Sequence, residues 1–415
     1  MPTIDDIAPD RATYRPREAA SVTVTLTNDG GAALSGRLML VLSHLAQSVM
    51  LLEQAVQVGP DATTTVTFSL TPPAASLRGY GLDVTLVDAD GHVLAEGSGA
   101  LDVLERWSQA PRYGFLSDFA PGQADVAARC DSLCRYHLNV VQFYDWMWRH
   151  YALLPPTDDF TDALGRRLSL HTVRTAIAAV RERGGAALAY GAVYGAEPEF
   201  ADEHPELALF DEQGRRISLA ELFYIMNIAP GSPWVPLIVA EFAAAVRVLG
   251  FDGLHLDQYG FPKTACTASG ELVDLAEHFP PLIDAARAAV VVERPDAGVI
   301  FNAVGNWPIE TVASTTQDVV YIEVWPPDDS YNDLQRLIRD ARRLSGGKQV
   351  ILAAYLMPFA DADTATLPQA EAAALLATAT IAASGGSHLL LGERDGILCD
   401  PYYPKYAKLR PEFAA

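Results

Sequence analysis

An alternation of strand-like and helix-like segments from Tyr113 to Glu393 constrains the fold of this chain more than any other feature. Eight apolar runs have the length and composition of buried strands: residues 113–119, 139–146, 186–194, 253–260, 299–306, 319–325, 349–356 and 388–393. Helical patterns separate these runs, and several of them end at a glycine. Eight such units predict a (β/α)8 TIM barrel. An open doubly wound sheet is the alternative, but no glycine-rich phosphate loop follows the first strand.

The first hundred residues have a different rhythm. Short alternating runs, such as SVTVTLTN and TTTVTFSLT, are separated by turn residues, and DADGH at 88–92 predicts a hairpin turn. We therefore expect a multidomain chain of β and α/β class. An immunoglobulin-like β-sandwich would occupy residues 1–106, a catalytic barrel residues 107–400, and a C-terminal tail residues 401–415, where truncation before a further β-sandwich is one of the possibilities.

Composition excludes several classes of partner. The 415 residues carry a formal net charge of −22, which argues against nucleic acid or an anionic membrane as a ligand. No apolar run is long enough to span a membrane.

Cys130 and Cys134 lack the spacing of a zinc site, so we expect buried free thiols. No HExxH motif or other metal pattern is present, and we expect neither a metal nor a cofactor.

Two segments, GFDGLHLDQYG at 250–260 and DVVYIEVWPP at 318–327, each deliver one acid near the end of a strand. By strand parity, Asp257 shares a face with His255, and Glu323 shares a face with Tyr321. The two strands are the fourth and sixth of eight, so their ends flank the fifth strand at the mouth of the barrel. Paired carboxylates in this position predict glycoside hydrolysis, and a separation of roughly 5–5.5 Å would make it retaining.

Further side chains at strand ends are expected to bind a sugar, because rings stack on sugar C–H faces while acids and amides bond to hydroxyl groups. These predicted substrate-binding residues are Asp118, Tyr144, Asp145, Trp146, Tyr190, Tyr194, Gln258, Asn302, Trp325 and Glu393.

Structural alternatives remain open for several strand-end residues. Asp118 could instead be a turn residue, and Asp145 could hold Arg149. We expect His255 and His388 to be hydrogen-bonded residues of the barrel interior rather than metal ligands.

The chain resembles glycoside hydrolase family 66, the dextranases and cycloisomaltooligosaccharide glucanotransferases. The matching segments are PRYGFLSDF, NVVQFYDWMWRH, AYGAVYGAE, GFDGLHLDQYG, YIEVWP and HLLLGERDGILCDPYYPKY, in family order from 111 to about 406. The resemblance implies an immunoglobulin-like domain before the barrel and a retaining mechanism on α-1,6-linked glucan. It assigns the nucleophile to Asp257 and the acid/base to Glu323, with Asp118 and Asp145 in the glycone subsite.

Two departures from the family pattern refine this expectation. Family members usually have a C-terminal β-sandwich, for which the chain ends too early, and the cyclising enzymes carry an inserted carbohydrate-binding module that is missing here. We therefore expect a monomeric endo-dextranase that acts on dextran or isomaltooligosaccharides. The alternatives are a cyclising or transglycosylating enzyme on the same substrate, a catalytically weak glucan-binding protein, and an enzyme for another α-linkage. The family implies secretion, although MPTIDDIAPD shows no signal peptide, and a cytoplasmic location is the alternative.

Overall fold

A computed structural model describes residues 2–360, 363, 365–399, 406–408, 410 and 413 of the protein. The chain forms two compact units. The first contains the residues up to Ala110 and the short segments Leu133–Asn139 and Glu182–Gly185, and the second contains the rest of the described chain. Most of the predicted tail at 401–415 lies outside the described residues.

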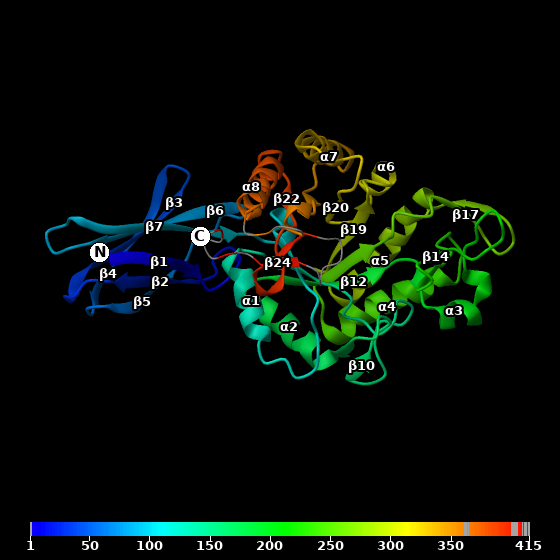
Figure 1. The fold of residues 1–415 in the computed structure, drawn as a ribbon, viewed down its shortest axis with the longest axis horizontal. Coiled ribbons are helices and arrows are strands. Elements are labelled where there is room, and N and C mark those ends of the chain that lie inside the picture. Colours follow the sequence, from blue (N-terminus) through cyan, green and yellow to red (C-terminus); the bar gives the residue numbers. More distant parts are fainter. Residues whose placement is uncertain are drawn as a thin grey trace. The chain divides into compact units, whose positions relative to one another are not determined.

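Seven strands of the first unit are β1 (Pro2–Pro9), β2 (Ala20–Asn28), β3 (Leu34–His44), β4 (Gln47–Val58), β5 (Ala62–Leu70), β6 (Arg78–Val87) and β7 (Val93–Val103). They form two antiparallel sheets with the strand orders β1-β2-β5 and β4-β3-β6-β7, drawn in blue in Figure 1.

The two sheets of the first unit share one hydrophobic core, to which Val24 of β2, Leu40 of β3 and Val84 of β6 belong. Along β2 every second residue is buried, which is the alternation expected of a strand with one face on a core. The predicted turn at 88–92 joins β6 to β7, whereas β1 and β4 were not predicted from the sequence. The immunoglobulin-like topology stays a prediction.

Eight parallel strands form the sheet of the second unit: β8 (Tyr113–Leu116), β9 (Val140–Phe143), β12 (Ala186–Ala192), β16 (Gly253–Asp257), β19 (Gly298–Val304), β20 (Val319–Glu323), β21 (Val350–Ala353) and β22 (Ser387–His388). Their spatial order follows the sequence from β8 to β22. A parallel bridge between Phe115 and Gly392 connects the two edges of the sheet. The predicted barrel is therefore confirmed as a nearly closed eight-stranded barrel, and the doubly wound alternative is excluded.

Helices separate the barrel strands (Figure 1): α1 (Val126–Arg135), α2 (Leu170–Glu182), α4 (Trp234–Leu249), α5 (Phe279–Glu293), α6 (Ile309–Val312), α7 (Tyr331–Leu344) and α8 (Leu367–Ala383). Helix α4 ends at Gly250, whose φ of 80° is the left-handed conformation that glycine adopts easily. Helix α7 begins with a capping box between Ser330 and Asp333. No helix among the described residues combines the length and apolarity needed to cross a membrane.

The predicted strand parity is confirmed. Val320 and Ile322 of β20 pack in a hydrophobic cluster with Leu337 of α7, outside the barrel. Tyr321 points the other way and meets His255 of β16, with ring centroids 4.8 Å apart. Asp257 and Glu323 each lie two residues beyond these interior rings, so the same parity aims both acids at the barrel mouth.

The connections after β12 and β16 contain additional structure rather than plain loops. After β12 come β13 (Gly195–Ala196), α3 (Pro198–Glu203), η2 (Pro205–Leu207), β14 (Ser218–Leu219) and β15 (Phe223–Ile225). After β16 come β17 (Thr264–Cys266), β18 (Leu272–Asp274) and η3 (Leu275–Glu277), and a small hairpin of β10 (Asp159–Thr161) and β11 (Arg167–Ser169) follows β9.

Candidate active site

Asp257 and Glu323 are the last residues of β16 and β20, and Asn302 of the intervening strand β19 lies between them. The Asn302 Nδ2 group donates to Asp257 Oδ1 at 2.8 Å and to Glu323 Oε2 at 3.1 Å. Because one nitrogen reaches both acceptors, the two oxygens are no more than about 6 Å apart, which includes the roughly 5–5.5 Å typical of retaining glycosidases. The structure therefore brings the predicted acid pair together.

Two tyrosines hold the outer oxygens of the pair. Tyr190 of β12 donates its O–H to Asp257 Oδ2 at 2.8 Å, and Tyr355, just after β21, donates to Glu323 Oε1. Every carboxylate oxygen of the pair thus accepts a hydrogen bond from a side chain. The orientation of both carboxyl groups is consequently fixed by side chains of three other strands or strand ends.

Aromatic rings lie next to these tyrosines. The Trp325 ring is 5.9 Å from the Tyr355 ring in an edge-to-face contact, and 37% of Trp325 is exposed. The half-buried Tyr144 ring lies 5.0 Å from the Tyr190 ring. Trp325 and Tyr144 can therefore offer ring surface to a ligand beside the acid pair.

Burial raises the pKa of Asp257 to about 7, and the charge of Glu323 adds to this rise. Burial also raises the pKa of Glu323, while hydrogen bonds from Tyr355, Asn302 and Trp325 act to lower it. Ionising both groups would place two buried negative charges side by side. The pair therefore holds one shared proton at mildly acidic pH, the state in which one carboxylate and one carboxylic acid coexist.

The layer beneath the pair is a ring cluster in the barrel interior. His255 is buried, its Nδ1 lies 2.6 Å from the Tyr113 hydroxyl, and burial lowers its pKa to about 3. His388 is also hydrogen-bonded, to Thr378 and to the carbonyl of Ala354. His255 is therefore a barrel-interior residue with a partner, as predicted, whereas His388 lies on the outer side of the sheet, because its partner Thr378 belongs to helix α8 and its neighbour Leu352 faces the helices.

Asp118 and Asp145 follow β8 and β9, and each is paired with an arginine. Asp118 lies 3.1 Å from Arg394; although burial acts to raise it, the pKa of Asp118 is lowered by the Ala120 amide and this arginine. Asp145 lies 3.5 Å from Arg166, and burial raises its pKa against the effect of that charge. Asp118 also accepts a hydrogen bond from the Ala120 amide, so its predicted turn role is present too.

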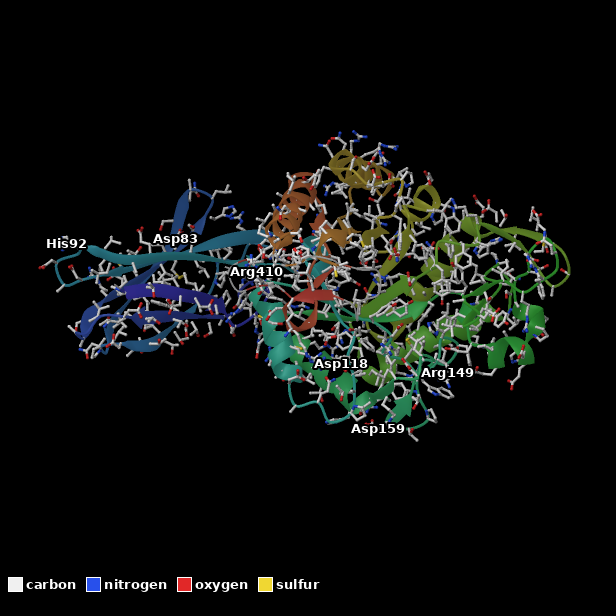
Figure 2. All side chains as sticks on the ribbon, viewed as in Figure 1. Asp83, His92, Asp118, Arg149, Asp159 and Arg410 are labelled. Carbon is white, nitrogen blue, oxygen red and sulfur yellow. The ribbon has the colours of Figure 1, made fainter. Side chains whose placement is uncertain are left out.

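The partner expected for Asp145 is different from the one observed. Arg149 instead bonds to Glu199 at 3.0 Å, and its guanidinium group lies over the Trp148 ring. Figure 2 labels Asp118 and Arg149, which extend from the loops after β8 and β9. Arg166 and Arg394 were not predicted as partners from the sequence, because neither arginine has a sequence spacing to its aspartate that would indicate contact.

The side chains of four predicted substrate-binding residues are buried at the top of the barrel and make hydrogen bonds within the protein. This corrects the expectation that their polar groups are free to bind a sugar. Trp146 is completely buried, and its indole donates to the Tyr190 carbonyl at 3.1 Å. The Tyr194 hydroxyl donates to the Phe261 carbonyl at 2.7 Å. The Gln258 amide donates to the carbonyls of Asn302 and Trp307.

Glu393 is the fourth of these residues and is only 1% exposed. Its carboxylate accepts hydrogen bonds from the Ser117 amide and hydroxyl and from the Asp118 amide, and it pairs with Arg129 at 2.5 Å. All oxygens of Glu393 are therefore engaged between the two edge strands of the barrel, and it stabilises their closure.

One cluster of the described residues has metal-ligand character. Asp88, Asp90 and His92 lie within 4.8 Å of one another on the turn between β6 and β7, where Figure 2 labels His92. Asp88 already accepts the amides of Asp90 and His92, as turn residues commonly do. These contacts account for the cluster as a turn, and it belongs to the first unit rather than to the acid pair.

An acid pair at the mouth of an eight-stranded barrel, flanked by aromatic rings, is the arrangement that hydrolysis or transfer of glycosyl groups requires. The sequence pattern of glycosyl hydrolase family 66 matches residues 9–410. The chain belongs to this family.

Individual relatives agree with this assignment. The cycloisomaltooligosaccharide glucanotransferase of Niallia circulans is 31% identical over 399 residues, which cover 91% of this chain and 40% of that protein. The dextranase of Streptococcus salivarius is 22% identical over 394 residues, covering 79% and 46%. A Paenibacillus sp. cycloisomaltooligosaccharide glucanotransferase complexed with cycloisomaltoheptaose matches with a TM-score of 0.80 and 29% identity, covering 87% and 54%. This chain thus spans about half the length of these relatives or less.

Proposed function

We propose that the protein is a retaining endo-dextranase that hydrolyses α-1,6-glucosidic linkages to isomaltooligosaccharides. The observation that carries the proposal is the single amide of Asn302 bonded to both acids, which holds Asp257 and Glu323 at a separation suited to a covalent glycosyl intermediate. Family membership and the dextranase relative support the substrate class.

In the proposed first step, an Asp257 oxygen attacks the anomeric carbon from the face opposite the glycosidic oxygen. The bond from that carbon to the glycosidic oxygen breaks, and Glu323 gives its proton to the departing oxygen. In the second step Glu323, now a carboxylate, removes a proton from water, whose oxygen attacks the same carbon and releases Asp257. Each step moves one proton, and the enzyme returns to its starting state.

The hydrogen bonds of Asp257 support its role as nucleophile, although burial and the charge of Glu323 raise its pKa to about 7. Asp257 accepts a hydrogen bond on each oxygen from neutral donors, Tyr190 and Asn302, which stabilise a carboxylate without neutralising it. Burial raises the pKa of Glu323, which favours the protonated acid, and the hydrogen bonds from Tyr355, Asn302 and Trp325 oppose this rise. In the proposed reactive state the shared proton is on Glu323, because Asp257 must be ionised to attack the anomeric carbon.

The first prediction is that Asp257→Ala and Glu323→Gln each lose at least about 10³-fold in kcat/KM on dextran while retaining a wild-type circular dichroism spectrum. Added azide separates the two roles in Asp257→Ala and a Glu323→Ala variant. Without the nucleophile, azide enters from the vacant face and gives a β-glucosyl azide. Without the acid/base, azide intercepts the covalent intermediate and gives an α-glucosyl azide. Exchanged configurations would reverse the assignment, and substantial residual activity would overturn it.

A second candidate is cyclisation or transglycosylation on the same substrate, because the 31% identical relative is a cycloisomaltooligosaccharide glucanotransferase. Here a glucan hydroxyl replaces water in the second step. Chromatography of the products from dextran distinguishes linear from cyclic isomaltooligosaccharides. Binding of dextran with no products at all would indicate the weak glucan-binding protein. A monomeric state and secretion also stay predictions.

A further inference from the structure

A pocket separate from the acid pair lies between two hairpins, which belong to the connections that follow β12 and β16. Its volume is about 590 Å³, and it is lined by the Asp211–Arg216 turn, by Ser218, and by Thr264 to Cys266 of β17. Phe210 and Cys266 exchange two backbone hydrogen bonds of 2.8 Å, which tie the first hairpin to the second. Figure 1 shows β14 and β17 in the same part of this unit.

The walls of this pocket are held in place by local hydrogen bonds. The Asp211 carboxylate accepts the amides of Gln213 and Arg215 and also bonds to the Arg215 guanidinium group at 2.8 Å. Arg216 is fixed by Asp202 at 2.7 Å and by stacking on the Tyr224 ring. A ligand would therefore meet a formed pocket and would not have to order a loose loop.

The chemistry of the lining selects a neutral ligand rich in hydroxyl groups. Asp211 and Glu212 balance the charges of Arg215 and Arg216, and both arginines are already paired with carboxylates. An anion would have to displace those carboxylates and approach a chain with a net charge of −22. The half-buried Phe210 ring offers an apolar face for stacking. The arginine–carboxylate ion pairs present hydrogen-bond donors and acceptors next to one another. Sugars bind to this combination of an apolar face with donors and acceptors.

The pocket is close to the acid pair in the chain but separate from it. Pro262 lines the pocket and follows Asp257 by five residues, so the two Cα atoms are no more than about 19 Å apart. None of the residues lining the pocket is hydrogen-bonded to Asp257 or Glu323 in the described part of the chain. A polymer with one unit at the acid pair could therefore reach the pocket with a distant unit.

We propose that this pocket is a remote glucan-binding site that holds a distal segment of the polymer whose linkage is cleaved at Asp257 and Glu323. The inference rests on the proposed function and deepens it, because it makes the enzyme prefer long chains over short ones. Contacts made far from the cleaved bond bind substrate and transition state alike, so they lower KM for polymer without changing kcat.

The test compares dextran with a short chromogenic isomaltoside as substrates of the full chain. Thr264→Arg fills the pocket from an exposed strand position, and Phe210→Ala removes the ring. Both variants should raise KM for dextran about 5- to 20-fold, the loss expected for one or two polar or stacking contacts, and leave the short substrate unchanged. Arg247→Ala, on an exposed part of α4, is the matched control and should change neither value.

Direct binding provides the second readout. In a background of Asp257→Asn, dextran should retard the protein in affinity electrophoresis, and Thr264→Arg should weaken this retardation. Unchanged dextran kinetics in both pocket variants, or an equal loss on both substrates, would overturn the remote site alone. A wild-type protein inactive on both substrates would instead overturn the proposed function, and this inference with it.

Discussion

At the scale of single residues, the acid pair is organised by neutral donors rather than by cations. Asn302 serves both carboxylates, while Tyr190 and Tyr355 each serve one. A lysine or arginine in these places would stabilise two ionised acids and remove the shared proton. Neutral donors orient the carboxylates and still allow one of them to stay protonated, which acid–base catalysis requires.

The two tyrosines give a prediction about pH dependence. The Tyr190 hydrogen bond lowers the pKa of Asp257, and the Tyr355 hydrogen bond lowers the pKa of Glu323, so removing either raises the corresponding pKa. Because Asp257 must be ionised, Tyr190→Phe should move the acidic limb of kcat/KM upward by about 0.5–1 pH unit. Because Glu323 must be protonated, Tyr355→Phe should move the alkaline limb upward by a similar amount.

Initial rates between pH 4 and pH 9 measure both limbs, and Tyr331→Phe, an exposed change on α7, is the control. If Tyr190→Phe moved the alkaline limb and Tyr355→Phe moved the acidic limb, Glu323 would be the nucleophile and Asp257 the acid.

At the scale of elements, the closure of the barrel depends on its shortest strand. β22 contains only Ser387 and His388, and among the described residues one β-bridge, from Phe115 to Gly392, pairs the backbones of the two barrel edges. Glu393 reinforces this closure from inside, since it accepts bonds from the end of β8 and pairs with Arg129 of α1. The ion pair is therefore part of the wall that carries Asp118.

The prediction at this scale concerns stability. Glu393→Ala removes the buried carboxylate at 2.5 Å from Arg129 and leaves only the more exposed Asp125 at 3.7 Å, so the free energy of unfolding should fall by about 3–5 kcal/mol. Urea denaturation measures the change. Glu293→Ala breaks the more exposed pair with Arg247 and should cost only about 0–1 kcal/mol. Equal effects in the two variants would show that Glu393 does not hold the barrel edges together.

At the scale of the whole molecule, the net charge of the protein distinguishes between anionic and neutral glucans of similar length. The net charge of −22 and the pI near 4.7 create a negative field at neutral pH. Polyanions are repelled by this field, whereas a neutral polysaccharide is unaffected. The same field acts at the acid pair and at the remote pocket.

We therefore predict that dextran sulfate, at pH 7 and low ionic strength, does not inhibit cleavage of the chromogenic isomaltoside at concentrations where dextran of equal length competes fully. Inhibition constants for the two polymers measure the difference. Strong inhibition by dextran sulfate that salt relieves would reveal a basic binding surface and contradict the prediction.

The sequence by itself determined the barrel, the face of each strand that carries the acids, and the two acids themselves. These features depend on local periodicity and on chain order, since consecutive parallel strands bring their C-terminal ends to one face. The small domain was predictable as β structure for the same reason, although two of its strands were missed.

Only the tertiary structure decided which residues touch the acids and which are part of the wall. Strand alternation ends where the backbone leaves the sheet: β9 stops at Phe143, and Asp145 has a φ of 49°, so Trp146 turns into the core instead of the site. Arg166 and Arg394 find their acids through contacts between separate loops, which no local pattern encodes. The bridging amide of Asn302 exists because β19 pairs with both β16 and β20, so that the three neighbouring strand ends lie within hydrogen-bond distance.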